Sequence, residues 1–136
     1  YAPRGCGLSV TVKNARGKSA KHIVEWTGRQ IANTAYDTAA VLLDTDTDWS
    51  QAVAKFAKTK KIRVLTSEPR FDALMLRLVG ESPSGDAKAM KKQLAPYVNQ
   101  DATQRDHYAA HFGAECLQAC RAQESTIDAL LKLFGV

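Results

Sequence analysis

A short apolar run that ends in three aspartates is the feature that most constrains how this chain folds. Residues 39–43 read Ala-Ala-Val-Leu-Leu, and aspartates follow at positions 44, 46 and 48. A run of this length is typical of a strand buried in the middle of an α/β sheet. Because open α/β sheets bind ligands at the carboxyl ends of their strands, we expect a candidate site at this acidic edge.

The spacing of the aspartates is compatible with two different roles. Side chains alternate along an extended strand, so Asp44 and Asp46 are predicted to point to one side and Thr45 to the other. Two close carboxylates repel each other unless a cation lies between them, and their hard oxygen atoms suit Mg²⁺ or Mn²⁺. Alternatively, Asp44 or Asp46 caps the next helix and the other acids are solvated turn residues.

Length and composition favour a globular protein with one domain. The chain has 136 residues and a formal net charge of +5, which is compatible with a polyanionic partner such as nucleic acid. No apolar run approaches the ~20 residues that cross a bilayer, so no membrane contact is expected. The first residues lack the pattern of a signal peptide and read as a trimmed start.

The segment before the acidic strand predicts a strand, a basic turn and a helix. Residues 8–12 alternate apolar and polar side chains, as a strand does, and Ser19 is a suitable N-cap for the helix that follows. We expect this helix to carry Ile23, Val24, Trp26 and Ile31 at roughly helical spacing and to end between Gly28 and Asn33.

The basic turn at residues 13–19 is a candidate phosphate-binding segment. Its Gly-Lys-Ser triplet does not complete a P-loop, because the motif needs a glycine five positions before Gly17 and Val12 stands there. Lys13, Arg16 and Lys18 are still candidates to contact nucleic-acid phosphates at the start of a helix. The alternative is a solvated basic turn.

The chain after the acidic strand predicts a parallel crossover. Residues 49–59 read as an amphipathic helix with Asp48 or Thr47 as its cap, and residues 62–65 form a second apolar strand. A strand, helix and strand at this spacing indicate a right-handed parallel unit. We therefore expect Thr66, Ser67 and Glu68 to emerge beside Asp44 and Asp46.

The rest of the sequence predicts helices. Residues 71–79 are apolar on nearly all sides, residues 87–97 form a further helix that Pro96 ends or kinks, and residues 105–134 form one or two more with a break near 124–125.

The chain has three cysteines, a small and odd number that does not suit a disulfide framework, which favours a reducing, cytoplasmic setting. Cys116 and Cys120 would lie opposite His107 and His111 on one helix, so we expect packing roles rather than a zinc site.

Two motifs together resemble the Toprim domain, specifically the RloB-like and related small prokaryotic Toprim proteins. The first is Val-Leu-Leu-Asp44-Thr-Asp46, and the second, after the crossover, is Ser67-Glu68-Pro-Arg-Phe-Asp72-Ala-Leu. The second is similar to the Ser-Asn-Pro-x-Phe-Glu-x-Trp-Leu-Leu segment of that group. The resemblance covers about residues 8–97, and this chain lacks the glutamate-bearing strand and helix that precede the motif in the family.

The resemblance implies a three-layer α/β fold, with a mostly parallel sheet of about three to four strands flanked by helices. Residues 1–98 would form this core, and residues 99–136 a helical extension packed on the same domain. It also implies Mg²⁺-dependent (or Mn²⁺-dependent) phosphodiester chemistry on DNA or RNA, of a nuclease type that often serves phage defence. Asp44 and Asp46 match the acidic motif, Glu68 is a further candidate metal ligand, and Ser67 joins the basic turn as a candidate phosphate contact.

Two other functions compete with metal-dependent chemistry. In a haloacid-dehalogenase-like phosphatase, Asp44 would be the nucleophile, Asp46 the acid and Thr66 a phosphate contact, but that family needs a later strand with paired acids. In a non-catalytic binding or assembly module, the acidic edge is vestigial and the helical tail contacts a partner protein or a second copy of the chain.

Overall fold

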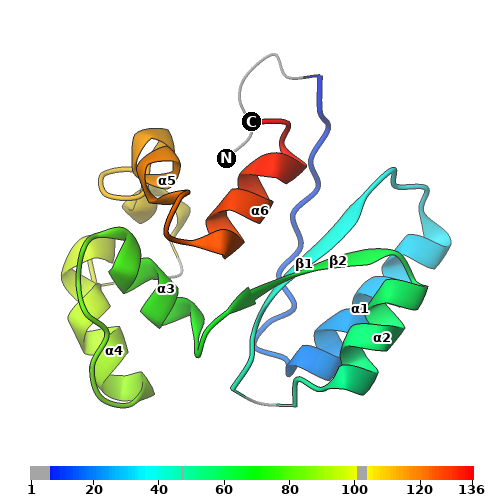
Figure 1. Cartoon of the computed structure of the whole chain (residues 1–136), viewed down its shortest axis with the longest axis horizontal. Helices are drawn as coiled ribbons and strands as arrows, with labels where there is room; N and C mark the ends of the chain where they lie inside the picture. Colours follow the sequence, from blue (N-terminus) through cyan, green and yellow to red (C-terminus); the bar gives the residue numbers. More distant parts are fainter. Residues whose placement is uncertain (1–6, 47, 101–103) are drawn as a thin grey trace. The chain divides into compact units, whose positions relative to one another are not determined.

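A computed structural model of the chain describes residues 7–46, 48–100 and 104–136, with Arg105 described by its backbone alone. The chain divides into two compact units, one formed by Ser9–Arg70 and one that contains Phe71–Val136 (Figure 1). We call them the sheet unit and the helical unit and describe each by itself. The boundary predicted after residue 98 falls within the helical unit.

From residue 20 onward the sheet unit has the predicted order of helix, strand, helix and strand. It consists of α1 (Ala20–Asn33), β1 (Ala39–Asp44), α2 (Gln51–Thr59) and β2 (Ile62–Ser67). The two strands are parallel and joined through α2, with Ala39 opposite Ile62 and Asp44 opposite Ser67. The predicted parallel crossover is therefore confirmed.

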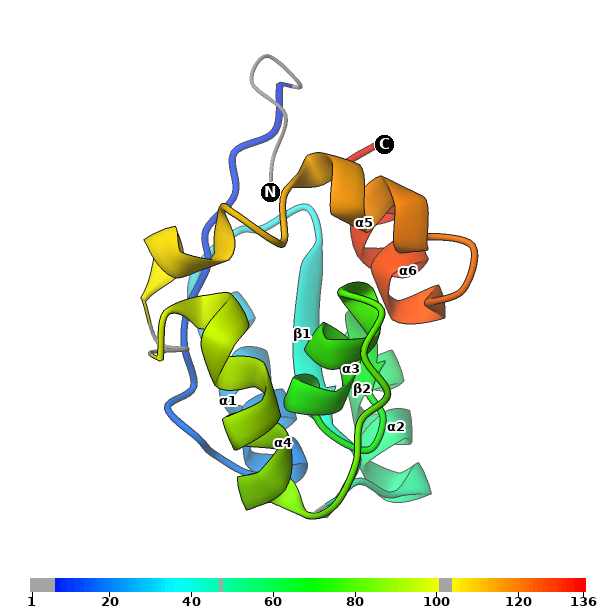
Figure 2. The same ribbon diagram turned by 90° about the vertical axis from the view of Figure 1, so that its left-hand side faces the viewer.

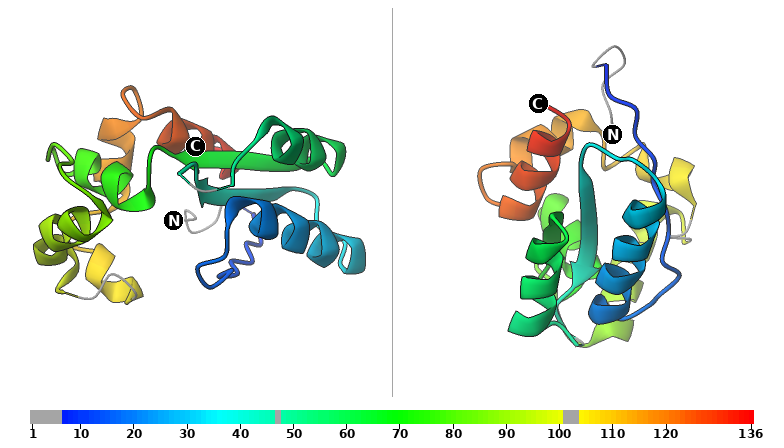
Figure 3. Two further views of the ribbon diagram at one scale, coloured as in Figure 1. Left: turned by 90° about the horizontal axis from the view of Figure 1, so that it is seen from below. Right: turned by 90° about the vertical axis from the view of Figure 1, so that its right-hand side faces the viewer.

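One face of this sheet carries the core of the sheet unit. Alternate strand residues Val41, Leu43 and Ile62 are buried together with Val24 of α1 and Val53 of α2. The two helices contact each other as well as the strands, and both lie along this face (Figure 3). The period of two in the strands and the apolar stripe of each helix explain this arrangement, because each element has one apolar side to bury.

The expectation of a three-layer sheet with three to four strands is not confirmed. The described residues form a sheet of two strands, and the helices of the sheet unit cover one of its faces. The strand predicted at residues 8–12 does not form. Its apolar side chains find no core there, since Val10 is exposed and Val12 is 87% exposed. Alternation predicts a strand only when a neighbouring strand and a buried face are available.

The helical unit contains the remaining elements. They are α3 (Phe71–Leu78), α4 (Ala87–Leu94), the 3₁₀ turns η1 (Ala95–Val98) and η2 (Arg105–Tyr108), α5 (Ala114–Cys120) and α6 (Ser125–Leu133). Helices α3 and α4 lie against each other (Figure 2). Pro96 ends α4 as predicted, because a proline cannot donate the next helical hydrogen bond. None of the helices in the described part of the chain combines the length and apolar character of a membrane-spanning segment.

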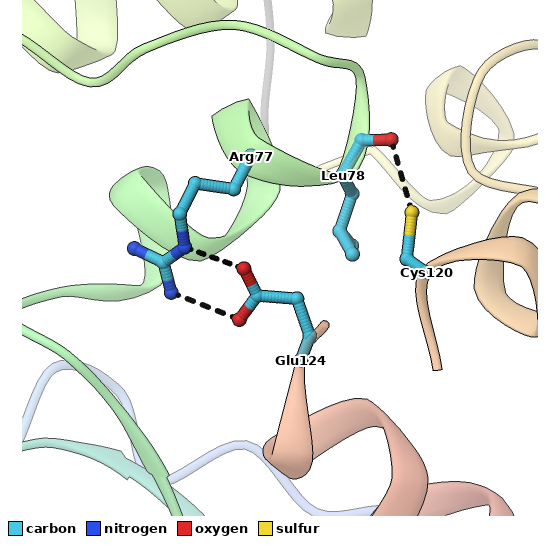
Figure 4. Close-up of polar contacts among 4 residues, drawn as sticks. All are labelled: Arg77, Leu78, Cys120 and Glu124. Atoms are coloured by element: carbon cyan, nitrogen blue, oxygen red, sulfur yellow. Dashed lines mark hydrogen bonds and ion pairs between the residues drawn. The ribbon is translucent and has the colours of Figure 1, made fainter. Parts of the chain in front are cut away.

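The core of the helical unit is built around α3. Leu74 and Leu76 are fully buried and pack with Leu94 of α4 and Leu131 of α6. An ion pair connects Arg77 of α3 to Glu124, the residue before α6. Arg77 Nε donates to Glu124 Oε1 at 2.6 Å, and Arg77 Nη2 donates to Glu124 Oε2 at 3.2 Å (Figure 4). This two-point geometry holds both side chains in one orientation.

Candidate functional site at the acidic edge

The carboxyl ends of the two strands form the acidic edge, which we define as Asp44, Asp46, Ser67 and Glu68. Asp44 and Ser67 are register partners, so the two strand ends lie side by side, as the crossover predicts. By alternation both residues belong to the sheet face opposite the one that packs against α1 and α2. Ser67 is 1% exposed and its hydroxyl has no hydrogen-bond partner among the described residues, whereas Glu68 is exposed.

Asp46 forms an ion pair that the sequence analysis did not predict. Strand β1 ends at Asp44, so Asp46 lies in a bend beyond the strand and alternation does not set its direction. Its Oδ2 lies 2.8 Å from Nη2 of Arg70, and their side chains are 21% and 37% exposed. The guanidinium therefore neutralises one of the two carboxylates that were expected to share a cation.

Asp48 contacts the first turn of α1 instead of capping the following helix. Its Oδ1 accepts a hydrogen bond from the backbone N–H of Lys21 at 3.1 Å. Helix α2 is capped by Ser50, whose Oγ accepts from Val53 N at 3.3 Å, so the expectation that Asp48 caps this helix is wrong. The other predicted cap, Thr47, lies outside the described residues. The start of α1 is thus joined to the loop that carries the aspartates.

These contacts decide whether the acidic edge fits a resident Mg²⁺ ion. A hard divalent cation needs several oxygen ligands that converge on one point. Within the described ranges, no three His, Cys, Asp or Glu side chains gather in a way that could hold a metal. Asp46 is paired with Arg70 and Asp48 with the start of α1. The described residues show no converging set of ligands for the ion, so the magnesium site stays a prediction and we derive no reaction step through it.

The basic turn forms a pocket with the first two turns of α1, which we call the α1 pocket. Its lining is Asn14, Ala15, Arg16, Lys18, His22 and Trp26, and its volume is about 260 Å³. Arg16 and Gly17 both adopt left-handed backbone conformations, with φ of 55° and 66°. The Asn14 side chain fixes this turn by accepting a hydrogen bond from Arg16 N at 2.7 Å.

The structure brings together only part of the predicted phosphate-binding set. Arg16 and Lys18 line the α1 pocket, whereas Lys13 points its Nζ to Gln30 Oε1 at 2.7 Å on the side of α1. Ser67 lies at the acidic edge and is buried. His22 and Trp26 also line this pocket and were not among the predicted residues. Their spacing of four positions on one helix places them on the same side, which is the signal that could have found them.

The cysteines and histidines of the tail have packing contacts of their own. Cys116 and Cys120 pack against the helical core, as expected, and each thiol donates a hydrogen bond to the carbonyl oxygen of Leu78, at 3.4 and 3.5 Å. His111 contacts the ring of Tyr97 edge-on, with centroids 5.4 Å apart. Burial, together with the neighbouring Cys120, raises the pKa of the Cys116 thiol.

Comparison with known proteins adds no family to these observations. No protein-family model, no curated protein and no solved structure matches the chain. The resemblance to the Toprim domain therefore rests on the two motifs of the sequence. The elements described after Val79 are all helical and supply no strand with paired acids, so the phosphatase hypothesis gains no support.

Proposed function

We propose that this chain is a non-catalytic module that binds the phosphate backbone of nucleic acid through the basic turn and the start of α1. The observation that carries the proposal is the α1 pocket, where Arg16 and Lys18 stand at a turn fixed by the Asn14 side chain. The fixed turn holds the backbone that carries both cations in place, so less backbone freedom is lost when a phosphate binds.

The charges around the pocket support the binding of a polyanion. Helix α1 has no acidic residue in its first turn, and its N-cap Ser19 makes no side-chain capping hydrogen bond. The positive end of the helix dipole lies beside the cations of the turn, and the Asp48 carboxylate, which accepts from the N–H of Lys21, offsets part of it. At the acidic edge the Arg70 guanidinium offsets the charge of Asp46, which reduces the repulsion of an approaching phosphate.

Fluorescence anisotropy with a labelled oligonucleotide tests this proposal. We expect binding that weakens as salt is raised, because cations that bind phosphates release counterions. The double variant Arg16→Ala, Lys18→Ala should bind more weakly and reduce the salt slope by about 1 for each cation removed. The double variant Lys55→Ala, Lys58→Ala is a matched control, since it also removes two positive charges and both lysines are exposed on α2. An equal decrease in affinity in both variants, or no binding at low salt, would contradict the proposal.

Mg²⁺-dependent phosphodiester chemistry of the Toprim type is the second candidate. It is favoured by the register that pairs Asp44 with Ser67 and brings Glu68 to the same edge. This chemistry requires that the ion pair between Asp46 and Arg70 open, so that Asp46 can bind the metal. It also requires a further strand, which would extend the sheet to the three or four strands of the predicted three-layer fold. Nicking of supercoiled DNA in Mg²⁺ or Mn²⁺ tests it, with Asp44→Asn as the control that should abolish nicking.

A further inference from the structure

The α1 pocket contains a tryptophan that the core of the sheet unit does not use. Trp26 falls at the helical spacing expected of a core residue, yet the core cluster and the side chains packed against it include Trp49 and omit Trp26. Trp26 is half-buried and lines the pocket with His22, one turn before it on α1. Its ring is therefore available as a wall of the pocket.

The chemistry of the pocket is that of a site for an aromatic ring attached to phosphate. Arg16 and Lys18 supply positive charge, and Trp26 supplies a large ring surface. A nucleobase stacks on an aromatic side chain whatever its sequence, because every base has a flat π surface. Cations beside such a ring bind the phosphates that flank the base.

The size of the pocket indicates how much of a ligand enters it. Its volume of about 260 Å³ lies below the ~300 Å³ at which pockets for whole small molecules begin. The pocket therefore suits one nucleotide of a longer strand better than a complete dinucleotide cofactor. In a duplex the bases are stacked on each other and their faces are covered, so only an unpaired base can reach the ring of Trp26.

We propose that the α1 pocket binds an unpaired base of single-stranded nucleic acid, with the base stacked on Trp26 and a flanking phosphate at Arg16 and Lys18. This inference rests on the proposed nucleic-acid binding and adds to it a preference for single strands over duplex. Backbone contacts alone would favour the duplex, because its charge density is higher.

The emission of Trp26 provides a direct test. Trp49 is the other tryptophan of the chain, so the variant Trp49→Phe leaves Trp26 as the only one. We expect an oligothymidylate of about 12 nucleotides, a length within the site sizes of single-strand binders, to quench this emission. An abasic oligomer of the same length, which has the phosphates without the bases, should bind without quenching, and a duplex should bind more weakly than the single strand.

Substitution of the ring gives the second measurement. Trp26→Leu should weaken binding of the oligothymidylate roughly 5- to 150-fold and leave binding of the abasic oligomer unchanged. Phe56→Leu is the matched control, because Phe56 is an aromatic residue of α2 that is 38% exposed and lies outside this pocket. Trp26→Phe keeps a ring and should retain most of the affinity, which separates the effect of stacking from a failure to fold.

The outcomes separate this inference from the function on which it rests. If all oligomers bind but the abasic and base-bearing strands bind equally and Trp26 is not quenched, the stacking site is wrong and the backbone-binding function stands. If none of the oligomers binds at low salt, both fail. An equal decrease of abasic and oligothymidylate binding in Trp26→Leu, with Trp26→Phe affected as strongly, would also overturn the stacking site.

Discussion

The guanidinium of Arg70 lies 2.8 Å from Oδ2 of Asp46, and this ion pair sets the charge that the acidic edge presents. Arg70 follows β2 and Asp46 follows β1, so the pair joins the two loops that leave the sheet at its carboxyl end. Arg70 therefore neutralises part of the negative charge that the carboxylates give to the acidic edge. The same ion pair separates the two candidate functions, because a cation and Arg70 compete for one carboxylate.

Arg70→Gln should therefore create a metal response that the parent chain lacks. With the guanidinium gone, the Asp46 carboxylate can bind a cation, and an ion bound only by the folded chain raises its stability. We expect millimolar Mg²⁺ or Mn²⁺ to raise the melting temperature of Arg70→Gln by ~3–5 °C, which corresponds to about 1 kcal/mol. Thermal shift assays with and without the metal measure this difference.

The control for this prediction is Arg70→Gln combined with Asp46→Asn, which should abolish the metal response. Without metal, Arg70→Gln should change the unfolding free energy by no more than about 1 kcal/mol, because the pair is partly exposed to solvent. A metal-dependent shift in the parent chain as large as in Arg70→Gln would show that the ion pair does not compete with a cation.

Sequence periodicity predicts the fold where each of the neighbouring elements has one apolar side to bury. Val41 and Leu43 alternate on β1, Ile62 and Val64 alternate on β2, and the helix between the strands has one apolar side, so the parallel crossover follows. Residues 8–12 show the same alternation without forming a strand. Their pattern describes a preference, whereas a strand also needs a partner edge to satisfy its backbone.

The candidate site is less predictable than the fold because its contacts lie beyond the ends of the regular elements. The register of Asp44 with Ser67 follows from the crossover. The direction of the Asp46 side chain cannot be predicted in this way, since Asp46 lies in a bend and its partner Arg70 lies outside the regular elements. Trp26 illustrates a different limit: helical spacing identifies the side of α1 on which it lies, but not whether that side meets the core or a pocket.

The ion pair of Arg77 with Glu124 should matter more for stability than the ion pairs that Asp128 of α6 forms. Both of its hydrogen bonds are charge-assisted, and the Glu124 side chain is only 16% exposed. Glu124→Gln should lower the unfolding free energy by about 1–2 kcal/mol, because the guanidinium then faces a neutral amide in place of a charged acceptor. Urea denaturation followed by circular dichroism measures the change.

Asp128→Asn is the comparison for that measurement. Asp128 pairs with Lys132 and Arg121, and hydrogen bonds from these two side chains lower the pKa of its carboxyl below the usual 3.8. Its stabilisation is present above pH 3.8 and is lost as the pH falls through the lowered pKa. At neutral pH we expect a smaller destabilisation than for Glu124→Gln, since the Asp128 side chain is 29% exposed and that of Glu124 16%, so solvent screens the charge of Asp128 more. A larger one would reverse our ranking of the two pairs.

Alanine substitutions at two glycines of the loop before α4 allow backbone strain to be separated from steric overlap. Gly80 and Gly85 have φ of 79° and 78°, so alanine is strained at either position by about 1 kcal/mol. A Cβ at Gly85 would also lie 2.8 Å from the Cβ of Ala89, whereas a Cβ at Gly80 meets nothing within 4 Å. We expect Gly85→Ala to lower the denaturation midpoint more than Gly80→Ala. Equal effects would show that the start of α4 moves aside at little cost.

The thiol of Cys116 should react with iodoacetamide more slowly at neutral pH than an ordinary thiol. Burial is the main cause that raises its pKa above 9.0, and the charge and hydrogen bond of Cys120 act in the same direction. Because the thiolate is the nucleophile, the alkylation rate should rise with a midpoint above pH 9.0.

The raised pKa also means that the contribution of the Cys116 thiol to stability is present below pH 9.0 and declines as the pH rises through the folded-state pKa. Mass spectrometry of the separated peptides follows each cysteine on its own. In Cys120→Ala the midpoint for Cys116 should move down only part of the way, since burial remains, and a midpoint below 9.0 in the parent chain would show that the thiolate is stabilised instead.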